Sequence, residues 1–212
     1  MWLQWLLDAQ RAQAAAVLPL VNDLPIGVDP GGADAWQWQD VLAGGVTVGA
    51  PPDAFNAGGQ NWSLPPLIPH RLRSAHYQPF IETLRALLQH TAGLRIDHVM
   101  GLFRLYWIPR GERPEVGAYV RYPEGELLAI VAVESQRAGG WVAGEDLGTV
   151  QRVVRNRLAK NAILSYKLMW FENKPPKDYP ALSMAAITTH DVPTFAGLWT
   201  GTDFQDQARI GQ

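Results

Sequence analysis

Leu94-Arg95-Ile96-Asp97-His98 is a short apolar stretch that turns acidic, and this pattern occurs twice more along the chain. The other two stretches are Trp141-Val142-Ala143-Gly144-Glu145-Asp146 and Ala186-Ile187-Thr188-Thr189-His190-Asp191. Each is typical of a short buried strand that ends in a carboxylate, a group that is costly to bury unless it is paired or used. A barrel enzyme assembles an acidic active site by placing such groups at the carboxyl ends of successive strands.

Helical patterns separate these stretches, so we expect strands and helices to alternate. About 50 residues separate each carboxylate from the next, which is enough for a helical crossover. Expected helices cover residues 2–16, 34–42, 77–90, 125–137 and 150–159, and expected strands cover 94–96, 141–143 and 185–188, with an apolar run at 163–170. An imperfect strand is expected over 17–21, because Pro19 cannot donate to a ladder. The alternation predicts an α/β fold with a parallel sheet.

Composition is that of an ordinary soluble globular protein. Of 212 residues, 47% are hydrophobic and 18% charged, and the net charge is −2, so no nucleic-acid partner is expected. The absence of cysteine excludes disulfides and thiolate metal sites. No apolar run approaches the about 20 residues that a membrane span needs. The first residues are apolar but lack a basic region, so no secretory signal and a cytoplasmic location are expected.

Two carboxylates suffice to hydrolyse or transfer a glycosidic bond, one as acid and base and the other as nucleophile or base. Arg95 lies two residues before Asp97 and on the same strand face, where it favours the ionised form of that carboxylate. His98 and His190 flank the acids and could bind sugar hydroxyls. A metal site made of these acids and histidines is conceivable, but no short ligand spacing supports it. Asp146 is expected to be structural.

Residues 29–69 form a long segment that is rich in Gly, Pro and Asn. Segments of this kind inside a compact domain are usually functional or disordered, and the interspersed Trp and Phe residues favour function. Most of the nine Trp residues are expected to be packing aromatics. Trp62 lies beside a polar loop, where a flat indole face could stack on a sugar ring.

Four segments resemble the conserved regions of the amylomaltases, which are 4-α-glucanotransferases of the α-amylase clan. They are Asn22-Asp23-Leu24-Pro25-Ile26, Leu94-Arg95-Ile96-Asp97-His98, Gly144-Glu145-Asp146-Leu147-Gly148 and Thr189-His190-Asp191. The loop from Gly49 to Trp62 is similar to the acceptor-side loop of that family. Nearly the whole chain matches in the right order, with Asn22 and Ser63 at positions where the family usually has Gly.

The resemblance implies a role for each matching residue. Asp97 would be the nucleophile, Glu145 the acid and base, and Asp191 the stabiliser of the distorted sugar. Arg95 would keep Asp97 ionised, while the remaining substrate contacts would come from Asp23, His98, His190, Phe55, Gln60 and Trp62, the last three on the acceptor side. The implied partners are α-1,4-glucans such as maltodextrins, with no metal or organic cofactor, no nucleic acid and no membrane.

The resemblance also implies a partial (β/α)8 barrel. We expect residues 1–212 to form about strands 3 to 7 of the catalytic barrel domain, with 43–70 as an inserted acceptor-side loop. Two alternatives to the transferase remain open. One is an α-glucan hydrolase with the same carboxylates, and the other is a truncated, inactive fragment that binds glucan.

Overall fold

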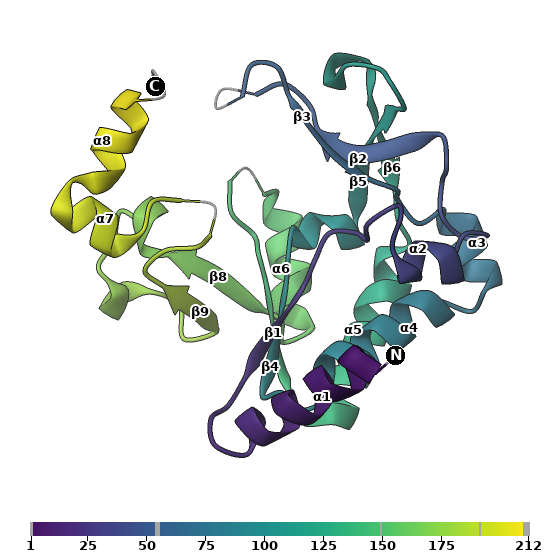
Figure 1. Cartoon of the computed structure of the whole chain (residues 1–212), viewed down its shortest axis with the longest axis horizontal. Coiled ribbons are helices and arrows are strands. Elements are labelled where there is room, and N and C mark those ends of the chain that lie inside the picture. The colour runs from purple at the N-terminus through teal and green to yellow at the C-terminus, as the bar shows by residue number, and fades with distance from the viewer. Residues whose placement is uncertain (1, 54–55, 149, 191, 210–212) are drawn as a thin grey trace.

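The computed structural model describes residues 2–53, 56–148, 150–190 and 192–209. Its larger sheet is parallel, with the strand order β1-β4-β7-β8-β9 (Figure 1). The strands are β1 (Val21–Leu24), β4 (Gly93–Ile96), β7 (Trp141–Gly144), β8 (Leu164–Leu168) and β9 (Ser183–Ala186). Because each strand of this sheet lies beside the next one in chain order, the sheet has the connectivity of a (β/α)8 barrel, as expected.

Three longer helices lie along the crossovers of this sheet. They are α4 (Gln78–Leu88), α5 (Glu124–Ala138) and α6 (Arg152–Lys160). Leu84 and Leu88 of α4 and Val131 of α5 join Leu94 of β4 in one buried apolar cluster. The expected helices at 77–90, 125–137 and 150–159 are therefore confirmed to within two residues at each end.

A second, antiparallel sheet lies to one side of the first, with the order β3-β2-β5-β6 (Figure 1). Its strands are β2 (Val46–Ala50), β3 (Gln60–Leu64), β5 (Arg104–Pro109) and β6 (Ala118–Arg121). Residues 43–70, expected as a loop, thus contain β2 and β3, and β2 also pairs with a hairpin contributed by residues 104–121. At Gly49 a Cβ would lie 2.0 Å from the main-chain oxygen of Gln60, so the close approach of β2 and β3 requires glycine there.

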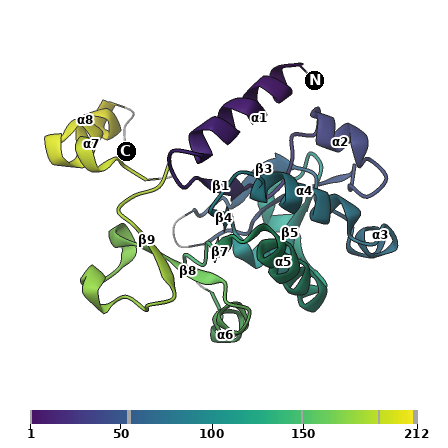
Figure 2. The ribbon, with the colours of Figure 1, turned by 90° about the horizontal axis from the view of Figure 1, so that it is seen from below.

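The remaining helices are short or peripheral. They are α1 (Trp2–Ala15), α2 (Ala33–Gln37), α3 (Pro69–Ser74), α7 (Phe195–Thr200), α8 (Thr202–Arg209) and the 3₁₀ helices η1 (Val99–Leu102), η2 (Pro114–Val116), η3 (Met169–Phe171) and η4 (Pro176–Asp178). Figure 2 shows α1, and the pair α7 and α8, outside the layers formed by the two sheets. Among the described residues, no helix is long and apolar enough to span a membrane.

The expectation of a strand over residues 17–21 is wrong. The main-chain N–H groups of Val17 and Leu18 both donate to Ala14, so the first helix ends in a turn there. Pro19 has no N–H to offer a ladder, and β1 begins only at Val21. Asp23 consequently lies within β1 rather than after it, and its partner in the ladder is Arg95 of β4.

Candidate active site

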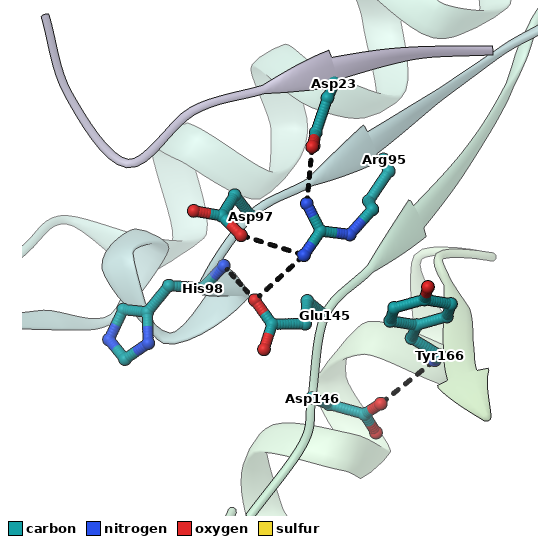
Figure 3. A network of polar contacts seen from close by, with 7 residues as sticks. All are labelled: Asp23, Arg95, Asp97, His98, Glu145, Asp146 and Tyr166. Carbon is teal, nitrogen blue, oxygen red and sulfur yellow. Dashed lines mark hydrogen bonds and ion pairs between the residues drawn. The ribbon is translucent and has the colours of Figure 1, made fainter. Parts of the chain in front are cut away.

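Three neighbouring strands bring acidic side chains to one edge of the parallel sheet. β1 and β4 pair in a register that places Asp23 opposite Arg95. The ladder continues one residue further, because the N–H of Asp97 donates to β1 and the N–H of Glu145 donates to β4, both at 2.9 Å. Asp97 and Glu145 therefore lie side by side at the carboxyl edge of the sheet (Figure 3).

The guanidinium of Arg95 lies at the centre of this acidic cluster. Its Nη1 donates to Asp23 Oδ2 at 2.6 Å. Its Nη2 donates to Asp97 Oδ1 at 2.8 Å and to Glu145 Oε2 at 3.3 Å. The Arg95 side chain is 9% exposed, so the guanidinium lies away from bulk water, where charges interact more strongly, while the side chains of its partners stay 21 to 46% exposed. The contact with Asp97 is predicted by the sequence, because residues two apart share a strand face. The contacts with Asp23 and Glu145 depend on strand register.

The surroundings of Glu145 favour its protonated form. Burial and the neighbouring Asp97 carboxylate raise the pKa of Glu145 to about 7, although the His98 N–H and the Arg95 guanidinium oppose that shift. The side chain keeps 21% of its surface exposed, so a substrate can still reach it. A carboxyl group with a pKa near neutrality both gives and takes protons readily, which suits general acid and base catalysis.

Gly144 allows a 3₁₀ helix to pack directly behind Glu145. A Cβ at Gly144 would lie 2.6 Å from a methyl group of Val99, the first residue of η1. This close approach lets the Val99 N–H donate to the main-chain oxygen of Glu145 at 3.1 Å. Glycine is therefore required at position 144, because a larger residue would keep Glu145 from lying between β4 and η1.

His98 connects the acidic cluster to the antiparallel sheet. Its backbone is left-handed, with φ of 44°, and its N–H donates to Glu145 Oε2 at 2.8 Å. Its ring meets the ring of Trp62 edge-on, with centroids 5.4 Å apart. Burial lowers the pKa of His98, so the imidazole is neutral at pH 7. His98 therefore contacts the acid with its main chain and the aromatic residue with its side chain.

An apolar cavity of about 150 Å³ lies next to Asp97 and His98. Its walls come from both sheets and from α4, with Trp38, Phe80 and Leu102 among the lining side chains. Apolar walls offer a water molecule few hydrogen-bond partners, so the cavity adds little solvation to these polar groups.

Two expected acceptor residues, Gln60 and Trp62, lie together on β3. Trp62 Nε1 donates to Gln60 Oε1 at 2.9 Å, which orients both side chains. Through its contact with His98, Trp62 also lies close to the acidic cluster. The third expected acceptor residue, Phe55, falls outside the described residues.

The third acidic strand end is described only in part. β9 pairs in register with β8, so the segment that follows it emerges at the same edge of the sheet. His190 is exposed in that segment. Asp191, the third expected catalytic residue, falls outside the described residues. Its role stays a prediction.

Asp146 and Tyr166 extend the cluster beyond the residues that sequence reasoning selected. The Asp146 carboxylate accepts hydrogen bonds from Ser165 Oγ at 2.8 Å and from the Tyr166 N–H at 3.0 Å. The Tyr166 ring lies 5.4 Å from the guanidinium carbon of Arg95 (Figure 3). Asp146 was expected to be structural, but Tyr166 was missed. It belongs to the apolar run 163–170, whose pattern does not distinguish it from a core aromatic.

Comparisons with known proteins give the family of this chain. The family model for 4-alpha-glucanotransferases matches residues 1–212. The 4-alpha-glucanotransferase of Mycobacterium tuberculosis is 46% identical over 226 residues, covering 99% of this chain and 31% of the relative. That of Haemophilus influenzae is 42% identical over 222 residues, covering 99% and 32%.

Among solved structures, the amylomaltase from Corynebacterium glutamicum superposes with a TM-score of 0.92 and 42% identity, covering 99% of this chain and 32% of that one. This match confirms the barrel-type fold, of which the five parallel strands form part. The chain spans about a third of the length of the curated relatives that it matches. Matched from its first residue to its last, this chain belongs to the 4-alpha-glucanotransferase family.

Proposed function

We propose that this chain carries catalytic residues of a 4-α-glucanotransferase, which moves α-1,4-glucan segments between maltodextrins with retention of configuration. The observation that carries the proposal is that Asp97 and Glu145 share one guanidinium nitrogen of Arg95, at 2.8 and 3.3 Å. Their bonded oxygens are therefore closer together than the about 6.5–9.5 Å that separates the carboxyl groups of inverting enzymes. This separation supports a covalent glycosyl-enzyme.

In the first half of the reaction, Asp97 attacks the anomeric carbon of the donor glucan. Glu145 gives its proton to the glycosidic oxygen, the bond to the leaving glucan breaks, and a glycosyl ester forms on Asp97. A pKa near 7 keeps a large share of Glu145 protonated for this step at neutral pH. The guanidinium of Arg95 donates to Asp97 Oδ1 and so orients the carboxylate that must attack.

In the second half, the 4-hydroxyl of an acceptor glucan attacks the same carbon. Glu145 now takes the proton of that hydroxyl, the ester bond breaks, and Asp97 is released as a carboxylate. Asp191 and His190 are proposed to grip the reacting sugar, and Asp23 supports the site through its ion pair with Arg95.

Transfer rather than hydrolysis is supported by the aromatic side chain beside the acids. Trp62 offers a flat apolar face near the site, and Gln60 offers a polar group bonded to it. Together with Phe55 they are proposed to bind the acceptor glucan, so that a sugar hydroxyl competes well with water for the ester. The hydrolase, which uses the same carboxylates, is the alternative that lacks this acceptor preference.

The proposed substrates are α-1,4-glucans such as maltodextrins and fragments of starch or glycogen. The proposed location is the cytoplasm, which the cysteine-free composition supports. Maltodextrin metabolism is the corresponding cellular role.

Incubation of the full chain with maltotriose tests the proposal. Glucose together with a ladder of longer maltodextrins is the expected result, and Asp97→Asn and Glu145→Gln should each abolish it. Glu112→Gln, at an exposed glutamate, is the matched control and should leave the ladder intact. Shortening of the substrate alone would establish the hydrolase instead. Retention on immobilised amylose without any product would reduce the role to glucan binding.

A further inference from the structure

We propose that Asp146 is a positioning residue for Glu145, and that it acts by tying the end of β7 to β8 where the main-chain ladder has stopped. The proposal rests on the acid and base role proposed above for Glu145. It concerns a buried carboxylate that takes no part in the two halves of the reaction described above. Only 3% of the Asp146 surface is exposed, so its oxygens depend on the groups around them for hydrogen bonds.

The ladder of paired residues between β7 and β8 is shorter than the ladder between β7 and β4. Four residue pairs join β4 to β7, whereas two pairs join β7 to β8, and the second of these is Gly144 with Ser165. Beyond Gly144 the carboxylate of Asp146, rather than the main chain, bonds to β8. It accepts the N–H of Tyr166 at 3.0 Å, and the hydroxyl of Ser165 lies 2.8 Å from each of its oxygens. A side chain thus continues the connection between the strands.

This connection affects Glu145 because the two residues are adjacent. On the β4 side, the main chain of Glu145 is held by hydrogen bonds at 2.9 and 3.1 Å. On the β8 side, it is held through Asp146. With both sides fixed, the side chain of Glu145 stays half-enclosed beside Asp97 and Arg95. Without Asp146, the β7 end is free to turn toward solvent.

A second contact carries the effect of Asp146 to Arg95. The Tyr166 N–H is bonded to Asp146, and the Tyr166 ring lies 5.4 Å from the guanidinium carbon of Arg95. A cation over an aromatic face is attracted to it, so the ring helps to hold the guanidinium in place. Asp146 therefore supports both the acid and the arginine that binds it.

The contact of Asp146 with α6 provides a matched control. Arg155 Nε lies 3.4 Å from Asp146 Oδ2, and Arg155 Nη2 lies 3.3 Å from the Asp146 main-chain oxygen. The Arg155 side chain is 47% exposed, and both of its contacts are longer than those that Asp146 makes with Ser165 and Tyr166. Arg155→Ala removes a partner of Asp146 without touching the connection to β8.

The test measures the pKa of Glu145 by a carbon-13 NMR titration of its side-chain carboxyl in the full chain, which needs no turnover. Asp146→Ala should lower this pKa by about one unit or more, because the freed side chain regains solvation. Ser165→Ala should shift it less, in the same direction. Asp146→Asn keeps an acceptor for the Tyr166 N–H and should restore much of the wild-type value. Arg155→Ala should leave it unchanged.

The proposal is overturned if Asp146→Ala and Ser165→Ala lower the melting temperature while the pKa of Glu145 in the folded chain keeps its wild-type value. If Asp146→Ala does not fold, Ser165→Ala and Asp146→Asn decide, since both keep part of the hydrogen-bond set. A chain that shows these shifts but forms no maltodextrin ladder would contradict the proposed transferase and leave the positioning of Glu145 established. In an active chain, kcat should fall with KM for maltotriose unchanged.

Discussion

The two sheets meet at the candidate site, but the interactions within each sheet differ. At the edge of the parallel sheet, one buried guanidinium binds three carboxylates from three strands. In the antiparallel sheet, aromatic rings pack on one another and on an arginine, as with Tyr106 and Tyr119 at 5.0 Å and Arg104 over Tyr119 at 4.2 Å. Loss of the guanidinium leaves its partly buried carboxylates unpaired beside one another, whereas loss of one aromatic contact removes only that contact. The charged edge should therefore be the less tolerant of the two.

The largest expected effect comes from Arg95, and Arg104 is its counterpart in the antiparallel sheet. Arg95→Met should lower the free energy of unfolding at pH 7 by about 3–5 kcal/mol, because it leaves a cluster of carboxylates without their cation. Arg104→Met, in the antiparallel sheet, should cost about 1 kcal/mol, the size of a partly exposed cation–π contact. Urea unfolding measures both. Equal losses would remove the distinction between the sheets, and the Arg95→Met loss should shrink at acidic pH as the carboxylates are protonated.

A second prediction concerns the pH dependence of stability at Glu145. Its pKa of about 7 in the folded chain lies above the ordinary value of 4.5. Stability from this group is therefore complete below pH 4.5 and is lost as the pH rises through 7. Glu145→Gln has no such loss, so it should match the wild type at low pH and exceed it by about 3 kcal/mol at pH 8.

The measurement for Glu145→Gln is urea unfolding across this pH range. Glu112→Gln, at the exposed glutamate, should show no comparable trend. A stability difference that stays constant with pH would contradict the raised pKa of Glu145.

On the aromatic side, Trp62→Ala should change the fate of the glycosyl ester more than its formation. The ratio of transfer to hydrolysis products from maltotriose should fall about tenfold, or about 1.4 kcal/mol, because the acceptor loses its aromatic surface. Chromatography of the products gives the ratio. Trp36→Ala, at a side chain that is 77% exposed on α2, should leave it unchanged. An unchanged ratio in Trp62→Ala would place the acceptor elsewhere.

The smallest expected effect is at Ser63, directly after Trp62. Its φ of 60° is left-handed, a conformation that costs most residues about 1 kcal/mol and costs glycine little. Ser63→Gly should therefore raise the free energy of unfolding by about 0.5 kcal/mol, since the greater freedom of unfolded glycine offsets part of the gain. Thermal unfolding measures it. Ser74→Gly, at an exposed serine that ends helix α3, should instead lower stability by about 0.5 kcal/mol, the difference in helix propensity between Ser and Gly.

The parallel sheet and its acids could be predicted because their signals are local. An apolar run followed by Asp97 or Glu145 indicates a buried strand and its end, and Arg95 two residues earlier shares a face with Asp97. The three crossover helices had the spacing expected of amphipathic helices. Strand register was not available in the sequence, so the contact of Arg95 with Asp23 and the contact of Tyr166 with Arg95 could not be derived.

The antiparallel sheet was harder to predict because its strands are short and interrupted by Gly and Pro. Residues 46–64 have the composition of a loop, and β5 and β6 lie on either side of a turn that contains Gly and Pro. Their pairing joins segments on opposite sides of β4 in the chain. The left-handed conformation of His98 was also missed, although it determines which main-chain group meets Glu145.

The central arginine also has a consequence for how the chain folds. Its partners Asp23 and Glu145 lie 72 and 50 residues away in the sequence, so no local segment can form the cluster by itself. Until β1, β4 and β7 are all in place, the carboxylates repel one another or stay in water. Contacts of such long sequence separation form slowly, because the chain between them must be ordered first. The ion pairs of Arg95 with Asp23 and Glu145 therefore form only when β1, β4 and β7 have come together, and they bind those strands together as a unit.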